Sequence, residues 1–206
     1  GATIKLSDTK LKDLNGELPM GKIKDFKISR LIMGGNLIGG WSHSRDLIYV
    51  SHLFKAYNTE QKVFETLHLA ERAGINSMNI TGIQLPLINK YRRIYDSKLQ
   101  IICQVHPKKE EPRKVIDYAM ENGADILQIQ GNCTDWRVRD GEIDVLVNAI
   151  DYIRQQGYVA GLGAHSVQAL VACDEAGITP DFYMKTLHHD NYWSAHPREN
   201  RIPFEV

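Results

Sequence analysis

The feature that most constrains the fold is a turn that occurs three times between an amphipathic helix and an apolar strand: Ala73-Gly74-Ile75, Asn122-Gly123-Ala124 and Ala176-Gly177-Ile178. In each case a helical pattern ends at a glycine, which readily adopts the left-handed conformation that closes many helices. The apolar segments are continuous runs rather than alternating ones, which is typical of parallel strands buried on both faces. The chain is therefore predicted to be an α/β protein built from repeated strand–helix units.

Periodicity and stop signals place the elements along the chain. A hairpin is expected over residues 21–28, where apolar residues alternate. The expected strands are 30–33, 75–80, 99–105, 124–129, 159–164 and 182–187, and the expected helices are 59–72, 85–95, 112–121, 143–156 and 167–176, with a short helix within 45–57. No linker-like segment interrupts this series, so one domain, residues 1–206, is expected.

Repeated strand–helix units either close into a (β/α)8 barrel or form an open, doubly wound sheet. The stretch Gly34 to Gly40 lacks the spacing of the dinucleotide-binding glycine motif, and no helix is expected to start there. A TIM barrel of the (β/α)8 type is therefore the predicted fold. A complete barrel usually takes about 250 residues. This chain has 206, so the barrel is expected to be incomplete at its C-terminal end.

The composition limits the kinds of molecule that this chain is expected to bind. The 25 basic and 25 acidic residues give a formal net charge of zero, which argues against a nucleic-acid surface. No apolar run reaches the about 18 residues of a membrane span. A small-molecule substrate is the expected partner, while the compartment and the oligomeric state are not predicted. Cys103 and Cys173 are expected to be buried, and Cys133, among polar residues, is expected to lie in a loop as the reactive thiol.

The order and spacing of these segments resemble the aldo/keto reductase family over residues 21–187. The resemblance rests on the hairpin, Ile28-Ser29-Arg30-Leu31 before Gly34-Gly35, Ala73-Gly74-Ile75-Asn76, the strand Ala124 to Ile129, and Gly157 to Ser166. It implies a (β/α)8 barrel that often binds NADPH and reduces carbonyl groups.

At the positions where that family places its catalytic groups, this chain carries amides. The positions of the family's aspartate, tyrosine, lysine and histidine read Asn79, Gln84, Gln104 and Gln130. Amides neither ionise nor relay a proton near neutral pH. The resemblance therefore implies a divergent member without the usual reductase chemistry, and NADPH binding is not expected in this chain.

Other polar side chains follow the expected strands, where a barrel enzyme gathers its active-site groups. They are His106 after the third strand, Asn132 after the fourth, His165 after the fifth, and Lys185, His188, His189 and Asp190 at the sixth. Imidazoles and a carboxylate from different strands are suited to a divalent metal such as zinc or manganese. The predicted metal ligands are His106, His165, His188 and Asp190.

The same positions supply the predicted catalytic residues, which are His165, Lys185 and His188. Lys185 is interpreted as a base, a Schiff-base former or an anion anchor. The predicted substrate-binding residues are Gln104, Gln130, Asn132 and Trp193.

Together these groups predict an aldo/keto-reductase-like barrel enzyme that acts on a small polar carbonyl or carbohydrate substrate. Metal-assisted isomerisation, epimerisation or elimination is the favoured reaction class. Two alternatives stay open: an NADPH-dependent oxidoreductase that uses other residues, and a non-catalytic barrel that binds a ligand. The feature that discriminates is whether His106, His165 and His188 converge on one place.

Overall fold

A computed structural model of the chain describes residues 17–42, 47 and 49–187. A two-stranded antiparallel sheet precedes six parallel strands, β3 to β8, that follow one another in the order of the chain. Helices separate the successive parallel strands. The predicted α/β fold of the (β/α)8 barrel type, with an N-terminal hairpin, is confirmed. Within the described ranges, no helix is long and apolar enough to cross a membrane.

The chain divides into two compact units by its internal contacts. The first comprises residues 1–79 and 86–100, and the second comprises residues 80–85 and 101–206. The assignment of the whole chain to one domain stays a prediction.

The first unit contains the hairpin, the first parallel strand and most of the second. The hairpin consists of β1 (Met20–Ile23) and β2 (Phe26–Ser29), and β3 (Met33–Gly34) pairs in parallel with β4 (Ser77–Thr81). Its helices are α2 (Asn36–Gly39), α3 (Val50–Tyr57), α4 (Glu60–Arg72) and α5 (Leu85–Tyr95). The last two residues of β4 and the first residue of α5 belong to the second unit. The Thr59 side chain caps α4 by accepting a hydrogen bond from the Lys62 backbone N–H. The buried Tyr91 hydroxyl donates to Glu71 over 2.5 Å and holds α5 against α4.

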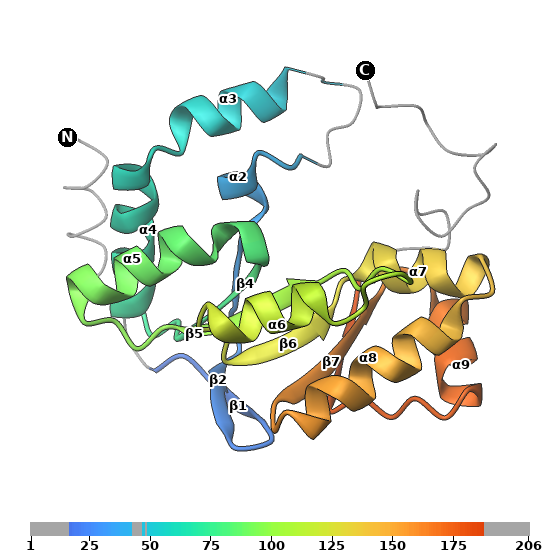
Figure 1. Cartoon of the computed structure of the whole chain (residues 1–206). Coiled ribbons are helices and arrows are strands. Elements are labelled where there is room, and N and C mark those ends of the chain that lie inside the picture. Colours follow the sequence, from blue (N-terminus) through green and yellow to red (C-terminus); the bar gives the residue numbers. More distant parts are fainter. Residues whose placement is uncertain (1–16, 43–46, 48, 188–206) are drawn as a thin grey trace. The chain divides into compact units, whose positions relative to one another are not determined.

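The second unit contains the remaining strands and their helices. In chain order these are the short helix η1 (Gly82–Gln84), β5 (Gln100–Val105), α6 (Lys114–Glu121), β6 (Ile126–Ile129), α7 (Gly131–Arg139), α8 (Ile143–Gln155), β7 (Val159–Ala164), α9 (Val167–Glu175) and β8 (Phe182–Lys185). Every residue of β6 is buried, as expected for a central parallel strand. Helix α8 packs on β6 and β7, and α9 packs on β7 (Figure 1).

Helix α7 is the main element that the sequence does not predict. It follows β6 directly and packs against β7, α8 and α9. Its buried residues are Cys133, Thr134 and Asp135, which are small or polar and give no apolar periodicity. The expectation that no helix starts after Gly34 is also wrong, because the short helix α2 begins at Asn36.

A glycine in β7 allows the neighbouring strand to approach closely. A Cβ atom at Gly163 would lie 2.7 Å from the Gln128 side-chain nitrogen and 2.8 Å from the Ile129 carbonyl oxygen. The second of these atoms is backbone, so it cannot rotate away. We expect Gly163→Ala to lower the free energy of unfolding by about 1–3 kcal/mol, as overpacking does in other cores. Urea unfolding measures the change.

The matched control is Gly34→Ala in β3, where an added Cβ would meet no atom within 4 Å. This substitution is expected to leave stability unchanged or to raise it by about 0.4–1 kcal/mol, because alanine restricts the unfolded chain. Equal effects at the two positions would contradict the close approach of β6 and β7.

Candidate active site

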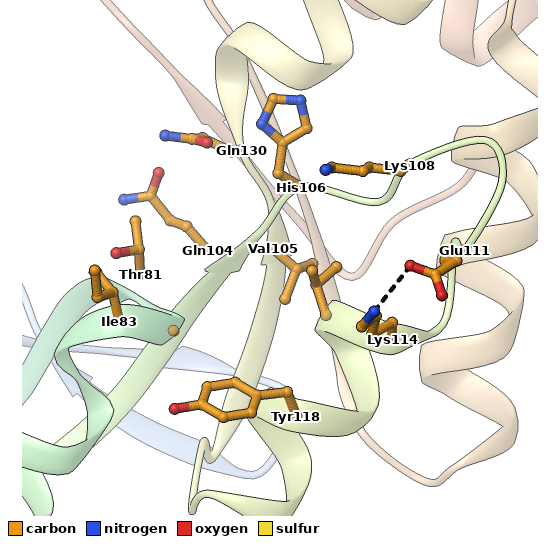
Figure 2. A pocket seen from close by; sticks show the side chains of 12 residues that line it. Thr81, Ile83, Gln104, Val105, His106, Lys108, Glu111, Lys114, Tyr118 and Gln130 are labelled. Carbon is orange, nitrogen blue, oxygen red and sulfur yellow. Dashed lines mark hydrogen bonds and ion pairs between the residues drawn. The ribbon is translucent and has the colours of Figure 1, made fainter.

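A pocket of about 500 Å³ lies within the second unit, at the carboxyl ends of β4, β5 and β6. Its volume is within the range of small-molecule sites, roughly 300–1,000 Å³. One wall is polar and carries Thr81, Gln104, His106 and Gln130 (Figure 2). Gln104 and Gln130 were both predicted to bind substrate, and the structure brings them into the same pocket as His106. The position agrees with the rule that barrel enzymes bind ligands at the carboxyl ends of their strands.

The rest of the pocket is formed by η1, the loop after β5 and the start of α6. Ile83, Val115 and Tyr118 supply apolar surface. The charged side chains on the lining are Lys108, Glu111 and Lys114, and Glu111 pairs with Lys114 over 3.0 Å (Figure 2).

Gln84 and Asn79, the other two amides noted in the sequence, do not line this pocket. Gln84 is buried and does not line the pocket; its side-chain oxygen accepts hydrogen bonds from the Thr81 backbone N–H at 3.0 Å and from the Thr81 hydroxyl at 3.4 Å. Gln84 thereby fixes the turn that presents Thr81 to the pocket. Asn79 is buried within β4.

His106 is largely neutral at neutral pH. Burial lowers the pKa of its imidazole below 6.5, the positive charges of Arg137 and Lys108 lower it further, and a hydrogen bond with Gln130 opposes them. The His106 ring also packs against Trp136 of α7, with 5.7 Å between the ring centroids. A neutral imidazole at a pocket wall is able to accept a proton or a hydrogen bond from a ligand.

The loop that carries His106 is fastened to α7. The Arg137 guanidinium donates to the Pro107 carbonyl oxygen over 3.2 Å and also forms an ion pair with Glu142. Glu142 pairs in addition with Lys109 over 3.2 Å. Because these contacts join the loop after β5 to the start of α8, His106 and Lys108 have a fixed support.

Cys133 lies on α7 with 0% exposure, and its thiol points at the Pro107 carbonyl oxygen, 3.9 Å away. Burial raises the pKa of this thiol to about 12. The prediction of a reactive loop cysteine is therefore wrong, because Cys133 lies in a helix and burial, by raising the pKa, suppresses thiolate formation. The predictions that Cys103 and Cys173 are buried are confirmed.

His165 follows β7 and is held by a buried carboxylate that the sequence analysis missed. Its Nδ1 lies 2.7 Å from Oδ2 of Asp135, a residue of α7. The other Asp135 oxygen accepts hydrogen bonds from the backbone N–H groups of His165, at 3.1 Å, and Ser166, at 3.3 Å. The Asp135 side chain is 1% exposed and the His165 side chain 16% exposed. The two residues form a histidine–aspartate dyad with a fixed ring orientation.

The absence of a side chain at Gly131 leaves space for the imidazole of His165. A Cβ atom at Gly131 would lie 2.8 Å from Cε1 of His165, so the ring covers the first residue of α7. Gly131 directly follows Gln130, which lines the pocket. Ser166 caps α9, since its hydroxyl accepts a hydrogen bond from the Gln168 backbone N–H over 3.1 Å.

The remaining predicted site residues are placed as follows. Lys185 ends β8 opposite Ala164 of β7, and its amino group donates to the Thr186 carbonyl oxygen over 2.6 Å. Asn132 is the second residue of α7, and its buried side-chain oxygen has no hydrogen-bond partner among the described residues. His188, His189, Asp190 and Trp193 lie outside the described residues.

The predicted metal site depends on two of those outlying residues, His188 and Asp190. Among the residues that the structure describes, no group of three or more histidine, cysteine, aspartate or glutamate side chains is arranged to hold a metal ion. The zinc or manganese site therefore stays a prediction.

Comparison with known proteins identifies the fold rather than a family. No protein-family model matches the sequence, and no curated protein matches it significantly. A crystal structure described as a deoxyribose-phosphate aldolase from Coccidioides immitis is similar with a TM-score of 0.50 and 12% identity, over 88% of this chain and 72% of that one. The DAHP synthase of Thermotoga maritima, a phospho-2-dehydro-3-deoxyheptonate aldolase, gives a TM-score of 0.43 and 15% identity, over 84% of this chain and 48% of that one.

These findings correct the family assignment made from the sequence. The similar structure with a TM-score of 0.50 is described as an aldolase and not as an aldo/keto reductase, so the resemblance to aldo/keto reductases is wrong. The order of hairpin, strands and helices that suggested it is a property of the barrel architecture, which unrelated enzymes share. The alternative of an NADPH-dependent oxidoreductase depended on that resemblance and is therefore no longer supported.

The electrostatics of the pocket give a prediction for His106. Replacing Arg137 by glutamine removes one of the positive charges that lower the pKa of His106, so that pKa is expected to rise toward 6.5. Arg139→Gln is the control, because Arg139 is on the same helix but is paired with the exposed Asp140. NMR titration of the imidazole resonances measures both. An unchanged His106 pKa in Arg137→Gln would contradict the role given to Arg137.

The same shift has a consequence for stability. Because the folded-state pKa of His106 lies below its ordinary value of 6.5, the unfolded chain binds more protons in this range. The contribution of His106 to stability is therefore complete above about pH 6.5 and decreases as the pH falls below it.

Proposed function

We propose that this chain is a barrel enzyme that moves a proton next to the carbonyl group of a small hydroxylated substrate of the carbohydrate class. The reaction would be an isomerisation, an epimerisation or an aldol-type cleavage. The observation that carries the proposal is the dyad of His165 and Asp135, in which a buried carboxylate fixes a histidine at the carboxyl end of a barrel strand.

In this proposal the two ring nitrogens of His165 have different roles. The Asp135 carboxylate, 2.7 Å from Nδ1, would accept the Nδ1 proton, so Nε2 would be the nitrogen that exchanges a proton with the substrate. The buried carboxylate stabilises the imidazolium that forms when His165 takes up a proton, without being protonated itself. Its hydrogen bonds from the His165 and Ser166 backbone hold it in place during this change.

The neighbouring pocket and the fold both support this reaction class. The amides Gln104 and Gln130 and the hydroxyl of Thr81 are suited to hydrogen bonds with sugar hydroxyl groups. The similar aldolase structure supports carbon–carbon bond chemistry on such substrates, although at 12% identity it shares only the fold. A metal-assisted form of the reaction would require His188 and Asp190 and remains a prediction.

The dyad is tested by measuring how fast the substrate hydrogen on the carbon next to the carbonyl exchanges with solvent deuterium. Purified protein is incubated in D₂O with a panel of small aldoses and ketoses, and the loss of the proton next to the carbonyl is followed by NMR. His165→Ala and Asp135→Asn are expected to lower the exchange rate by about 10²–10⁴, the usual contribution of a general acid–base group. The control is Asp144→Asn on α8, an exposed carboxylate. Wild-type exchange in both dyad variants would refute the assignment.

A second candidate within the same class is a Schiff-base mechanism at Lys185. The observation that favours it is the register of β8, where Lys185 lies opposite Ala164, the residue before His165. The lysine amine would attack the substrate carbonyl carbon, the carbonyl oxygen would leave as water, and an imine would form. His165 would then transfer the proton at the adjacent carbon.

This mechanism predicts a covalent product that can be trapped. Borohydride added during incubation with dihydroxyacetone or pyruvate would reduce the imine, and the protein mass would increase by that of the substrate less one oxygen. Peptide mapping is expected to locate the adduct at Lys185, and Lys185→Arg should abolish it. An adduct spread over surface lysines, or none, would exclude the Schiff base and leave the dyad alone as the proposal.

A further inference from the structure

The pocket in the second unit is lined by a lysine, Lys108, that is paired with no carboxylate in the part of the chain that the structure describes. Lys109 pairs with Glu142, and Lys114 pairs with Glu111. Lys108, the residue before Lys109, forms no ion pair with any residue that the structure describes, and its side chain lines the pocket beside His106 (Figure 2). A single lysine amino group at a pocket wall is a suitable partner for an oxyanion.

The backbone next to Lys108 is held in place by contacts with the rest of the second unit. Pro107, the residue before it, is buried, and its carbonyl oxygen accepts the hydrogen bond from Arg137. The carboxylate of Glu142 is occupied by Arg137 and Lys109, and that of Glu111 by Lys114. No acidic side chain on the lining is therefore left to compete for Lys108, among the residues described.

Other side chains that line the same pocket suit a hydroxylated carbon chain. Gln104, Gln130 and Thr81 offer neutral donors and acceptors, and Tyr118 offers the face or edge of a ring. Neutral polar groups with an aromatic surface bind a polyol without requiring charge on it. One end of the pocket thus favours an anion and the remainder favours hydroxyl groups.

We propose that this pocket binds a small hydroxylated acid, a sugar acid or a sugar phosphate, with its oxyanion at Lys108 and its hydroxyl groups at Gln104, Gln130 and Thr81. The statement that this ligand is the substrate rests on the proposed function. The binding itself does not, because it is measured without turnover.

The test compares two six-carbon polyols that differ at one end. D-gluconate carries a carboxylate where D-sorbitol carries a hydroxymethyl group, and inorganic phosphate is the third probe. Titration calorimetry at low ionic strength, where surface charges are least screened, is expected to show gluconate or phosphate binding at least about tenfold tighter than sorbitol. Phosphate binding would identify a phosphate group as the anion, and gluconate binding alone would identify a carboxylate.

Lys108→Ala is expected to reduce the affinity for the anion to that for sorbitol. Lys90→Ala is the control, because Lys90 is a surface lysine that pairs with Glu60 and does not line the pocket. Circular dichroism checks folding, and Lys108→Gln serves as a second variant that keeps most of the side-chain length. Equal affinity for gluconate and sorbitol, no binding of any probe, or full binding by both Lys108 variants would overturn the proposal.

The dyad variants separate this inference from the proposed reaction. If Asp135→Asn and His165→Ala retain wild-type exchange while anion binding requires Lys108, the proposed reaction fails and the binding site stands. If both dyad variants lose exchange and no probe depends on Lys108, the reaction stands and the binding proposal fails.

Discussion

The candidate site depends on one buried charge, the carboxylate of Asp135. It is 1% exposed and accepts hydrogen bonds from the Nδ1 of His165 and from two successive backbone N–H groups at the end of β7. A buried carboxylate without such partners would be strongly destabilising, and its three donors offset that cost. The same hydrogen bonds fix the turn from β7 to α9 and the orientation of the imidazole. The Asp135 carboxylate therefore both stabilises this turn and orients His165 for the proposed proton transfer.

Helix α7 extends this support to the pocket through three consecutive residues. Asp135 holds the turn after β7, Trp136 packs on the ring of His106, and Arg137 binds the Pro107 carbonyl oxygen in the loop after β5. Successive side chains on a helix diverge by about 100°, because a turn takes 3.6 residues. One short helix after β6 can therefore contact the loops of both neighbouring strands. This arrangement gives the two histidines a common rigid support, although they come from different strands.

Much of the fold could be predicted from the sequence, but the centre of the site could not. The strand Val159–Ala164 is found with the bounds that its apolar run predicts, and His165 and Ser166 follow it as expected. Helix α7 was missed because its buried face is made of Cys133, Thr134 and Asp135, which produce no apolar period. With it Asp135 was missed, since an aspartate in a polar stretch has no sequence signal that distinguishes a buried partner from a solvated one. The family resemblance failed for a related reason: strand order and glycine turns report the barrel and not its chemistry.

The measurement that tests the central claim most directly is the tautomer of His165. Long-range ¹H–¹⁵N correlation spectra distinguish a protonated Nδ1 from a protonated Nε2 in a neutral imidazole. If Asp135 orients the ring for proton transfer, neutral His165 should carry its proton on Nδ1 in the wild type, and Asp135→Ala should lose this preference. A proton on Nε2 in the wild type, or an unchanged spectrum in Asp135→Ala, would contradict the account.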